Sequence, residues 1–197
     1  MRETIIAGNW KQNGDWSLCE QFIRASEQSA DDKGLSRIQI VVCPPSLWIS
    51  ALSSGISSQW SVGAQNLSAE ADGAFTGETS GKMLSQAGAE YCIVGHSERR
   101  SLYGESDEVV CRKLAAATLA GLRPILCVGE DLSCRESGHA MEFVAEQLTA
   151  STKEMAPEDL RNLIVAYEPV WAIGTGKVAS EDQISQIFRS HFFGRSS

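Results

Sequence analysis

The sequence predicts an α/β protein with a parallel sheet. Six short runs rich in β-branched and apolar residues recur along the 197 residues, and turn-forming residues bound each run. Amphipathic stretches lie between the runs, and this alternation is typical of right-handed βαβ crossovers. Periodicity does not set the order of the strands, so both a doubly wound sheet and a barrel fit it. No G-x-G-x-x-G turn follows the first strand, and its absence argues against the interpretation as a doubly wound nucleotide-binding protein.

The elements follow from residue type and spacing. Each predicted strand is apolar along most of its length, so we expect every strand to be buried on both faces. The predicted strands are residues 4–9, 38–43, 60–65, 91–96, 123–130 and 163–168. Apolar residues at helical spacing predict helices over residues 16–29, 106–122, 141–151 and 180–193. Ser106 precedes Asp107 and Glu108 and is expected to cap the second of these helices.

Composition narrows the classes of protein and of partner. A hydrophobic content of 43% suits one globular domain. The net charge of −8 and pI of about 4.9 argue against a nucleic-acid or anionic-membrane surface. The six cysteines form no C-x-x-C pair and mostly lie in apolar segments, which indicates reduced thiols. No segment reaches the ~20 apolar residues that span a bilayer, so we expect a cytoplasmic protein.

Polar side chains collect where the predicted strands end. Because the carboxyl ends of parallel strands carry the chemistry in both candidate folds, this pattern predicts an active-site rim. The residues concerned are Asn9, Lys11, Gln65, Asn66, His96, Glu98, Glu130 and Glu168.

Glu168 ends an apolar run and precedes a segment that resembles a lid. Pro169 and two glycines can act as hinges, and an apolar middle part can cover a site. Desolvation under a closed lid would disfavour the charged carboxylate and make it a stronger base. An ordinary turn with a packed Trp is the alternative. The predicted lid consists of Pro169, Val170, Trp171, Ala172, Ile173, Gly174, Thr175, Gly176 and Lys177.

The loop over residues 64–80 is long for a βα connection, which usually has about two to six residues. It presents an aromatic residue in a Gly-rich context. It is either a flexible insertion or an ordered loop that docks into a partner subunit. The residues expected at this contact are Gln65, Asn66, Phe75, Thr76, Gly77 and Glu78.

Four stretches together resemble the triosephosphate isomerase family: AGNWKQNGD (7–15), GAFTGETS (73–80), VGHSERR (94–100) and AYEPVWAIGTGK (166–177). Their order and spacing match that family along the whole chain. The resemblance implies a TIM (β/α)8 barrel. It also implies an isomerase of glycolysis and gluconeogenesis that interconverts dihydroxyacetone phosphate and D-glyceraldehyde 3-phosphate, usually as a homodimer without cofactor or metal.

The resemblance assigns roles to individual residues. A carbonyl that moves to the neighbouring carbon needs a base, a hydrogen-bond donor for the oxygen and a counter-charge. Glu168, His96 and Lys11 match the family's catalytic residues, in which a glutamate is the base and a neutral histidine the electrophile, as is known for this enzyme. The family's pattern further implies substrate binding by Asn9, Lys11 and Gly174, and supporting roles for Glu98 and Cys127.

The length departs from the family. Barrels of this kind run to ~250 residues, so we expect residues 1–197 to form a single TIM-barrel domain that is incomplete at its C-terminus and holds only the first six βα units. The family's later phosphate-binding loops then have no counterpart, which should lower turnover. The alternative is a truncated, inactive or weakly active homologue that only pairs with other subunits.

Overall fold

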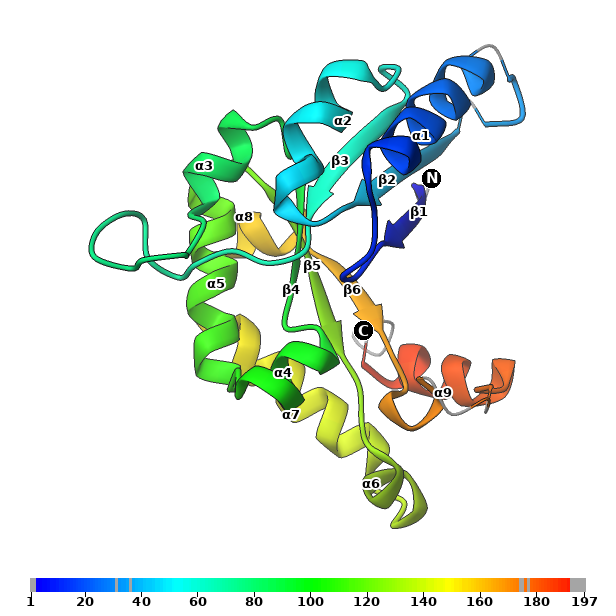
Figure 1. Cartoon of the computed structure of the whole chain (residues 1–197). Helices are drawn as coiled ribbons and strands as arrows, with labels where there is room; N and C mark the ends of the chain where they lie inside the picture. Colours follow the sequence, from blue (N-terminus) through cyan, green and yellow to red (C-terminus); the bar gives the residue numbers. More distant parts are fainter. Residues whose placement is uncertain (1–2, 31, 36, 174–175, 177, 192–197) are drawn as a thin grey trace. The chain divides into compact units, whose positions relative to one another are not determined.

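A computed structural model describes residues 3–30, 32–35, 37–173, 176 and 178–191 (Figure 1). The chain divides into two compact units. Unit 1 comprises residues 1–94 and 115–125, and unit 2 comprises residues 95–114 and 126–197. Each unit is described in turn.

The six strands found in the described part of the chain are hydrogen-bonded in the order of the sequence, β1-β2-β3-β4-β5-β6. A doubly wound sheet contains a point at which the strand order reverses, whereas a barrel adds each strand beside the last. The order therefore confirms the barrel-type α/β class. The strands are β1 (Thr4–Asn9), β2 (Ile38–Cys43), β3 (Trp60–Ala64), β4 (Tyr91–Val94), β5 (Arg123–Val128) and β6 (Ile164–Tyr167).

Several strands end one or two residues before the predicted boundary. β4 stops at Val94 and not at His96, because Gly95 has a φ of 71°. This left-handed conformation suits glycine and breaks the extended backbone. His96 therefore lies in the turn after the strand, directly before the helix α4 (Ser97–Tyr103).

Unit 1 packs helices against its strands. They are α1 (Trp16–Ser29), η1 (Ser46–Trp48), α2 (Ile49–Gly55) and α3 (Gly81–Gln86). Asp15 caps α1 by accepting from the Leu18 N–H, and Ser80 caps α3 by accepting from the Met83 N–H. The fully buried core includes Val41, Cys43, Ile49, Leu52, Val62 and Cys92.

The prediction that every strand is buried on both faces is wrong for β6, whose four residues are all only partly buried, and for β1. Four of its six residues are exposed, and Ile6 is 54% exposed. Among the described residues β1 pairs with β2 alone, in parallel register from Thr4↔Ile38 to Asn9↔Cys43. A strand with one neighbour leaves its other edge and the adjoining side chains open to solvent. An apolar sequence alone does not reveal whether a second neighbour is present.

Unit 2 contains the helices that surround β6 and the carboxyl half of β5. They are α4 (Ser97–Tyr103), α5 (Asp107–Leu119), α6 (Leu132–Glu136), α7 (Ala140–Thr152), α8 (Pro157–Leu160), η2 (Val170–Ala172) and α9 (Glu181–His191), and the last five residues of α5 belong to unit 1. Ser106 caps α5 as predicted and accepts from the Val109 N–H at 3.3 Å. The buried core of unit 2 includes Val110, Leu114, Leu126, Val144 and Ile187.

The long loop after β3 is closed at its base. The Ser68 N–H donates to the Thr79 carbonyl at 2.9 Å, and a turn at the tip is fixed by the Glu78 N–H and the Phe75 carbonyl at 3.0 Å. Figure 1 shows the loop projecting beside α3. The structure thus gives this loop internal hydrogen bonds, and Phe75 at its tip is exposed.

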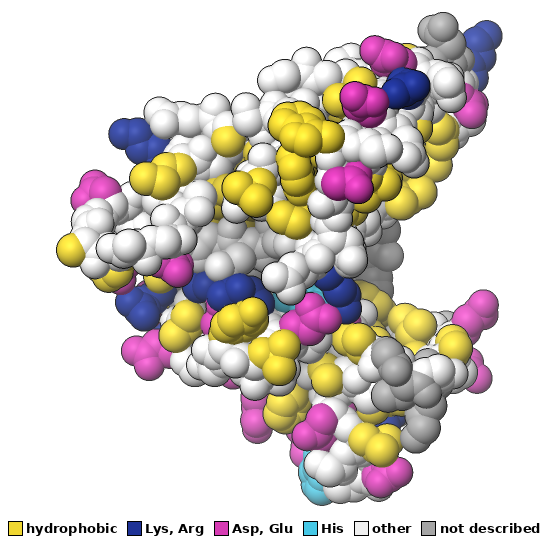
Figure 2. All heavy atoms as spheres, viewed as in Figure 1, with side chains coloured by type: hydrophobic (Ala, Val, Ile, Leu, Met, Phe, Trp, Pro, Cys, Tyr) yellow, Lys and Arg dark blue, Asp and Glu magenta, His cyan; other side chains and the backbone are white. Residues whose placement is uncertain are grey.

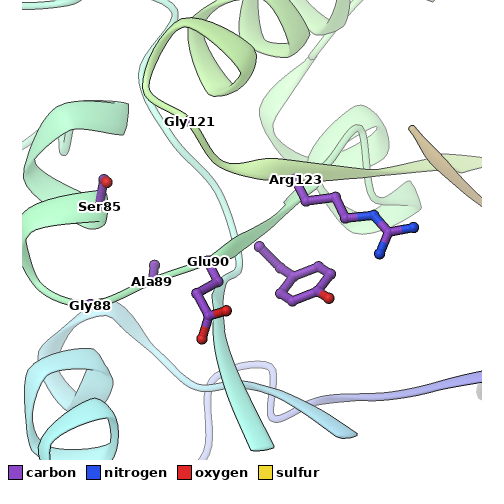
Figure 3. A pocket seen from close by; sticks show the side chains of 7 residues that line it. Ser85, Gly88, Ala89, Glu90, Gly121 and Arg123 are labelled. Atoms are coloured by element: carbon purple, nitrogen blue, oxygen red, sulfur yellow. The ribbon is translucent and has the colours of Figure 1, made fainter. Parts of the chain in front are cut away.

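A shallow pocket in unit 1 lies at the amino ends of β4 and β5 (Figure 3). The side chains of Glu90 and Arg123 project from the starts of these strands, and the Arg123 guanidinium lies 5.8 Å from the Tyr91 ring. Arg123 also pairs with Glu3 at 2.7 Å. In barrels the chemistry collects at the carboxyl ends of the strands, so this end serves stability.

All six cysteines are free thiols, and five of them are buried. Burial raises the pKa of the Cys43 thiol to about 12, so this thiol stays protonated and unreactive. None of the described helices is both long enough and apolar enough to cross a membrane.

Candidate active site

The turn that follows β1 in unit 1 is tightly held. Lys11 has a φ of 52°, and among the described residues it alone combines a positive φ with a side chain other than hydrogen. The Lys11 N–H donates to Asn9 Oδ1 at 2.9 Å. The Gln65 amide donates to the Lys11 carbonyl at 2.9 Å and to the Cys43 carbonyl at 2.8 Å. Strained backbone of this kind persists where neighbours over-determine it, and it clusters at functional sites.

Two of the predicted site residues thus support a third. Asn9 and Gln65 fix the backbone of Lys11 through short hydrogen bonds, and this role of Gln65 was not predicted. The feature of the sequence that could have indicated this role is the position of Gln65 directly after a strand. Asn66, also predicted at the partner contact, is half-buried beside it, whereas Thr76, Gly77 and Glu78 are exposed at the loop tip.

The other two predicted catalytic residues meet in unit 2. His96 Nε2 lies 3.4 Å from Glu168 Oε2, and these side chains are 12% and 17% exposed. Glu168 follows β6, and its Oε1 accepts from the Ser97 N–H at 2.6 Å. The carboxylate therefore rests at the N-terminus of α4, where unpaired N–H groups favour a negative charge.

The hydrogen bonds of His96 define its tautomer. His96 is the N-cap of α4, and its Nδ1 accepts from the Glu98 N–H at 3.2 Å. A nitrogen that accepts a hydrogen bond carries no proton, so the neutral ring has its proton on Nε2. This N–H faces Glu168. The Glu98 carboxylate lies 3.7 Å from Nδ1, close enough for the supporting role that was predicted for it.

A second glutamate, Glu130, anchors the first half of the predicted lid. Its side chain is fully buried after β5. The Tyr167 hydroxyl donates to Oε1 and Oε2 at 3.0 Å each, and the Trp171 indole N–H donates to Oε1 at 2.9 Å. Arg135 lies 3.5 Å from Oε1, and the Val170 N–H donates to the Glu130 carbonyl at 3.1 Å. The carboxylate thus ties η2 to the end of β5.

The same cluster perturbs Tyr167. Burial raises the pKa of Tyr167, and the charge of Glu130 and the hydrogen bond to it raise that pKa further. The sequence placed Glu130 at a strand end but gave it no role, and it did not single out Tyr167 or Arg135. The available signal was the indole N–H of Trp171, which needs an acceptor once the ring is buried.

Of the predicted lid, Pro169 to Ile173 and Gly176 are described, and Pro169, with a φ of −65°, directly precedes η2. Gly174, Thr175 and Lys177 lie outside the described residues. Cys127 is a buried thiol on β5. Within the ranges that the structure describes, no cluster of His, Cys, Asp or Glu could hold a metal ion.

A sheet with sequential strand order, and a carboxylate–imidazole pair placed after its sixth and fourth strands, define a barrel-type enzyme that moves protons. Comparison with known proteins makes the assignment specific. A family model described as triosephosphate isomerase matches residues 4–190. The chain belongs to the triosephosphate isomerase family, whose members are isomerases.

Individual relatives agree with the family model. The triosephosphate isomerase of Hahella chejuensis is 45% identical over 191 residues, which cover 96% of this chain and 75% of the relative. That of Thiobacillus denitrificans is 48% identical over 188 residues, or 95% of this chain and 74% of the relative. The crystal structure of the Bartonella henselae triosephosphate isomerase has a TM-score of 0.78 and 36% identity, covering 86% of this chain and 69% of that chain.

Proposed function

We propose that this chain interconverts dihydroxyacetone phosphate and D-glyceraldehyde 3-phosphate by proton transfer through an enediolate, without cofactor or metal, as a step of central carbon metabolism. The observation that carries the proposal is the pairing of a carboxylate and a neutral imidazole at 3.4 Å. One group can take a proton from carbon while the other donates to the adjacent oxygen.

The reaction needs a base at one carbon of the substrate. The Glu168 carboxylate takes a proton from the carbon next to the carbonyl, and the electron pair of that C–H bond forms the C=C bond of the enediolate. The resulting carboxylic acid returns the proton to the neighbouring carbon, which yields the isomer. Glu168 is held by the Ser97 N–H in this structure, so it must leave that hydrogen bond to reach the substrate.

The carbonyl oxygen gains negative charge as the proton leaves carbon. The Nε2–H of His96 donates to this oxygen and passes a proton between the two substrate oxygens. The Nδ1 atom accepts from the Glu98 N–H, so in the neutral ring it is the Nε2 atom that carries the proton and can donate it. The Lys11 ammonium supplies the counter-charge for the phosphorylated, enediolate-forming substrate, and Asn9 fixes the Lys11 backbone.

The lid completes the mechanism. Exclusion of water strengthens each electrostatic interaction with the enediolate and keeps it from losing its phosphate. Glu130 holds Trp171 and Val170 at the amino-terminal part of this segment. We include Gly174 among the phosphate contacts, and Cys127 among the supporting residues, on the family pattern alone.

We further propose that the chain acts as a homodimer in the cytoplasm. Unit 1 exposes several large apolar side chains, including Trp16 at 64%, Leu47 at 81% and Phe75 at 48%. Trp16 also stacks edge-on against Trp48 at 5.0 Å. Figure 2 shows apolar side chains gathered over the α1 and α2 region of this unit. Exposed apolar patches mark interaction sites, and the free thiols suit a reducing compartment.

The test is direct assay of the purified chain with D-glyceraldehyde 3-phosphate. Dihydroxyacetone phosphate is measured by its reduction with NADH in a coupled reaction. Glu168→Gln keeps an oxygen that can accept from Ser97 but removes the base, so turnover should fall by a factor of about 10² to 10⁴. Glu136→Gln, an exposed carboxylate in α6, is the matched control and should keep full activity. Equal turnover in the parent chain and in Glu168→Gln would refute the proposal.

A further inference from the structure

The peptide between Val128 and Gly129, at the end of β5, uses both of its polar groups. Its carbonyl oxygen accepts from the Glu168 N–H at 2.9 Å. Its N–H donates to the side-chain Oε1 of Gln147 at 2.9 Å, and this hydrogen bond is buried. The two groups of a trans peptide point in opposite directions. This one peptide therefore lies between the side chain of Gln147 and the backbone of Glu168.

Gly129 brings the two segments unusually close. A Cβ atom at this position would lie 1.8 Å from the Glu168 carbonyl oxygen and 2.7 Å from its carbonyl carbon. Backbone atoms cannot move aside as the tip of a flexible side chain can. Position 129 therefore requires glycine, and the backbone at the end of β5 lies directly against the backbone of Glu168.

Gln147 reaches this peptide from α7, far from Glu168 in sequence. Its side chain is 7% exposed, although glutamine is mostly found on protein surfaces. A buried amide is costly unless it is hydrogen-bonded. The bond to the Gly129 N–H satisfies the Oε1 atom, and the same bond satisfies a backbone donor that is buried with it.

We infer that Gln147 is a positioning residue for the catalytic carboxylate, and that it acts through the Val128–Gly129 peptide. This deepens the proposed function and rests on Glu168 being the base. Without the Gln147 acceptor, the buried Gly129 N–H is unpaired, and the peptide rotates toward another partner. The rotation turns the Val128 carbonyl away from the Glu168 N–H and shifts the base, and a displacement of about 1 Å can cost roughly 10²-fold in rate.

Kinetics separate positioning from general stability. Gln147→Met has nearly the same length and no comparable acceptor, and it should lower kcat by about tenfold with KM within about twofold, because the substrate-binding groups stay in place. Gln147→Glu keeps an acceptor oxygen and should restore kcat to within about threefold of the parent value. Val144→Ala removes buried methyl groups from the same helix and is the control. It should lower the melting temperature and leave kcat unchanged well below that temperature.

Amide hydrogen exchange, followed by NMR, tests the same inference without turnover. In Gln147→Met the Gly129 and Glu168 amides should exchange at least about tenfold faster. The Val110 amide, bonded to the Ser106 carbonyl, should be unaffected. If Gln147→Met does not fold, Gln147→Asn, whose amide is one methylene shorter, is measured in its place.

The outcomes distinguish the two proposals. A parent chain with no turnover above Glu168→Gln refutes the proposed function. Unchanged exchange at Glu168 in the Gln147 variant overturns the positioning role, and so does a loss of kcat that Val144→Ala reproduces. Faster exchange at Gly129 and Glu168, together with rescue of kcat by Gln147→Glu, supports it.

Discussion

Glu130 offers the sharpest test of how buried charge holds the lid in place. Its carboxylate is fully buried, and it accepts from Tyr167 and Trp171 and lies 3.5 Å from Arg135. Glu130→Gln keeps the shape but replaces one acceptor oxygen by a donor NH2 group. The remaining carbonyl oxygen can still accept from both Tyr167 and Trp171, so the substitution removes the charge that strengthens these two hydrogen bonds and the pairing with Arg135.

The magnitude follows from those losses. A hydrogen bond to a charged group is worth about 1.5–3 kcal/mol and a neutral one about 0.5–1.5 kcal/mol, so weakening two of them and losing the Arg135 pairing should lower the free energy of unfolding by about 2–4 kcal/mol. For a chain of this size 1 kcal/mol corresponds to about 2–4 °C, so the melting temperature should fall by roughly 5–15 °C. The assay is thermal unfolding followed by circular dichroism. Glu136→Gln changes the same charge on the exposed face of α6 and should shift the melting temperature by less than about 2 °C.

A second measurement identifies the cause. Burial raises the pKa of Tyr167 and the Glu130 charge raises it further, so in Glu130→Gln this pKa should fall but stay above its ordinary value. In tyrosine-labelled NMR spectra recorded at increasing pH, Tyr167 should ionise at a lower pH in Glu130→Gln than in the parent chain, and Tyr167→Phe identifies the signal. An unchanged melting temperature together with an unchanged Tyr167 titration would refute the account of Glu130 as a charged anchor.

Three further predictions follow from single groups. His96→Gln removes the Nε2–H that faces Glu168 and should lower kcat by at least about 10²-fold in the coupled assay. A variant with the same kcat as the parent chain would contradict the role proposed for His96. The Cys43 pKa is raised in the folded state to about 12, so the contribution of this thiol to the free energy of unfolding is complete below the ordinary thiol pKa. As the pH rises toward 12, the free energy of unfolding falls by up to about 1.4 kcal/mol per pH unit. Urea unfolding at pH 9 and 10 should therefore show a smaller loss of stability in Cys43→Ala than in the parent chain. If the chain forms the proposed homodimer through this loop, Phe75→Glu, which places a charge at the exposed loop tip, should lower the sedimentation coefficient to that of a monomer; an equal coefficient for the parent chain and the variant would contradict the proposed contact.

The alternation of apolar runs and amphipathic stretches predicted the class and, for the six strands and four helices that it predicted, most boundaries to within one or two residues, but it missed the short helices α2, α3, α6 and α8. It succeeded because buried parallel strands and amphipathic helices carry their own periodicity. Burial of β1 could not be predicted in the same way. TIIAGN has the apolar character of a central strand, but its exposure depends on whether another strand pairs with its second edge.

The candidate site likewise contains residues that the sequence predicts and features that only the structure reveals. Strand-end positions predicted a rim that includes Lys11, His96 and Glu168, and the family resemblance assigned their roles; the structure brings His96 and Glu168 together within unit 2. The Nε2–H tautomer of His96 depends on a backbone N–H two residues later, and helix-capping geometry is needed to see it. Gln147 lies on a helix 21 positions before Glu168, and neither its type nor its spacing indicates a buried contact.

Glu130 and Glu168 show how environment gives one residue type two functions. Both follow adjacent strands of the same sheet. Glu130 is enclosed by donors from three side chains and has no exposed surface, so its charge is fixed and it cannot move. Among the described residues, Glu168 accepts from the Ser97 N–H and lies 3.4 Å from the His96 imidazole, and its side chain is partly exposed, which suits the role of base that we propose for it. A base must be able to leave its resting hydrogen bonds during each turnover, whereas an anchor must keep them, and the number of donors around each carboxylate determines which task it can perform.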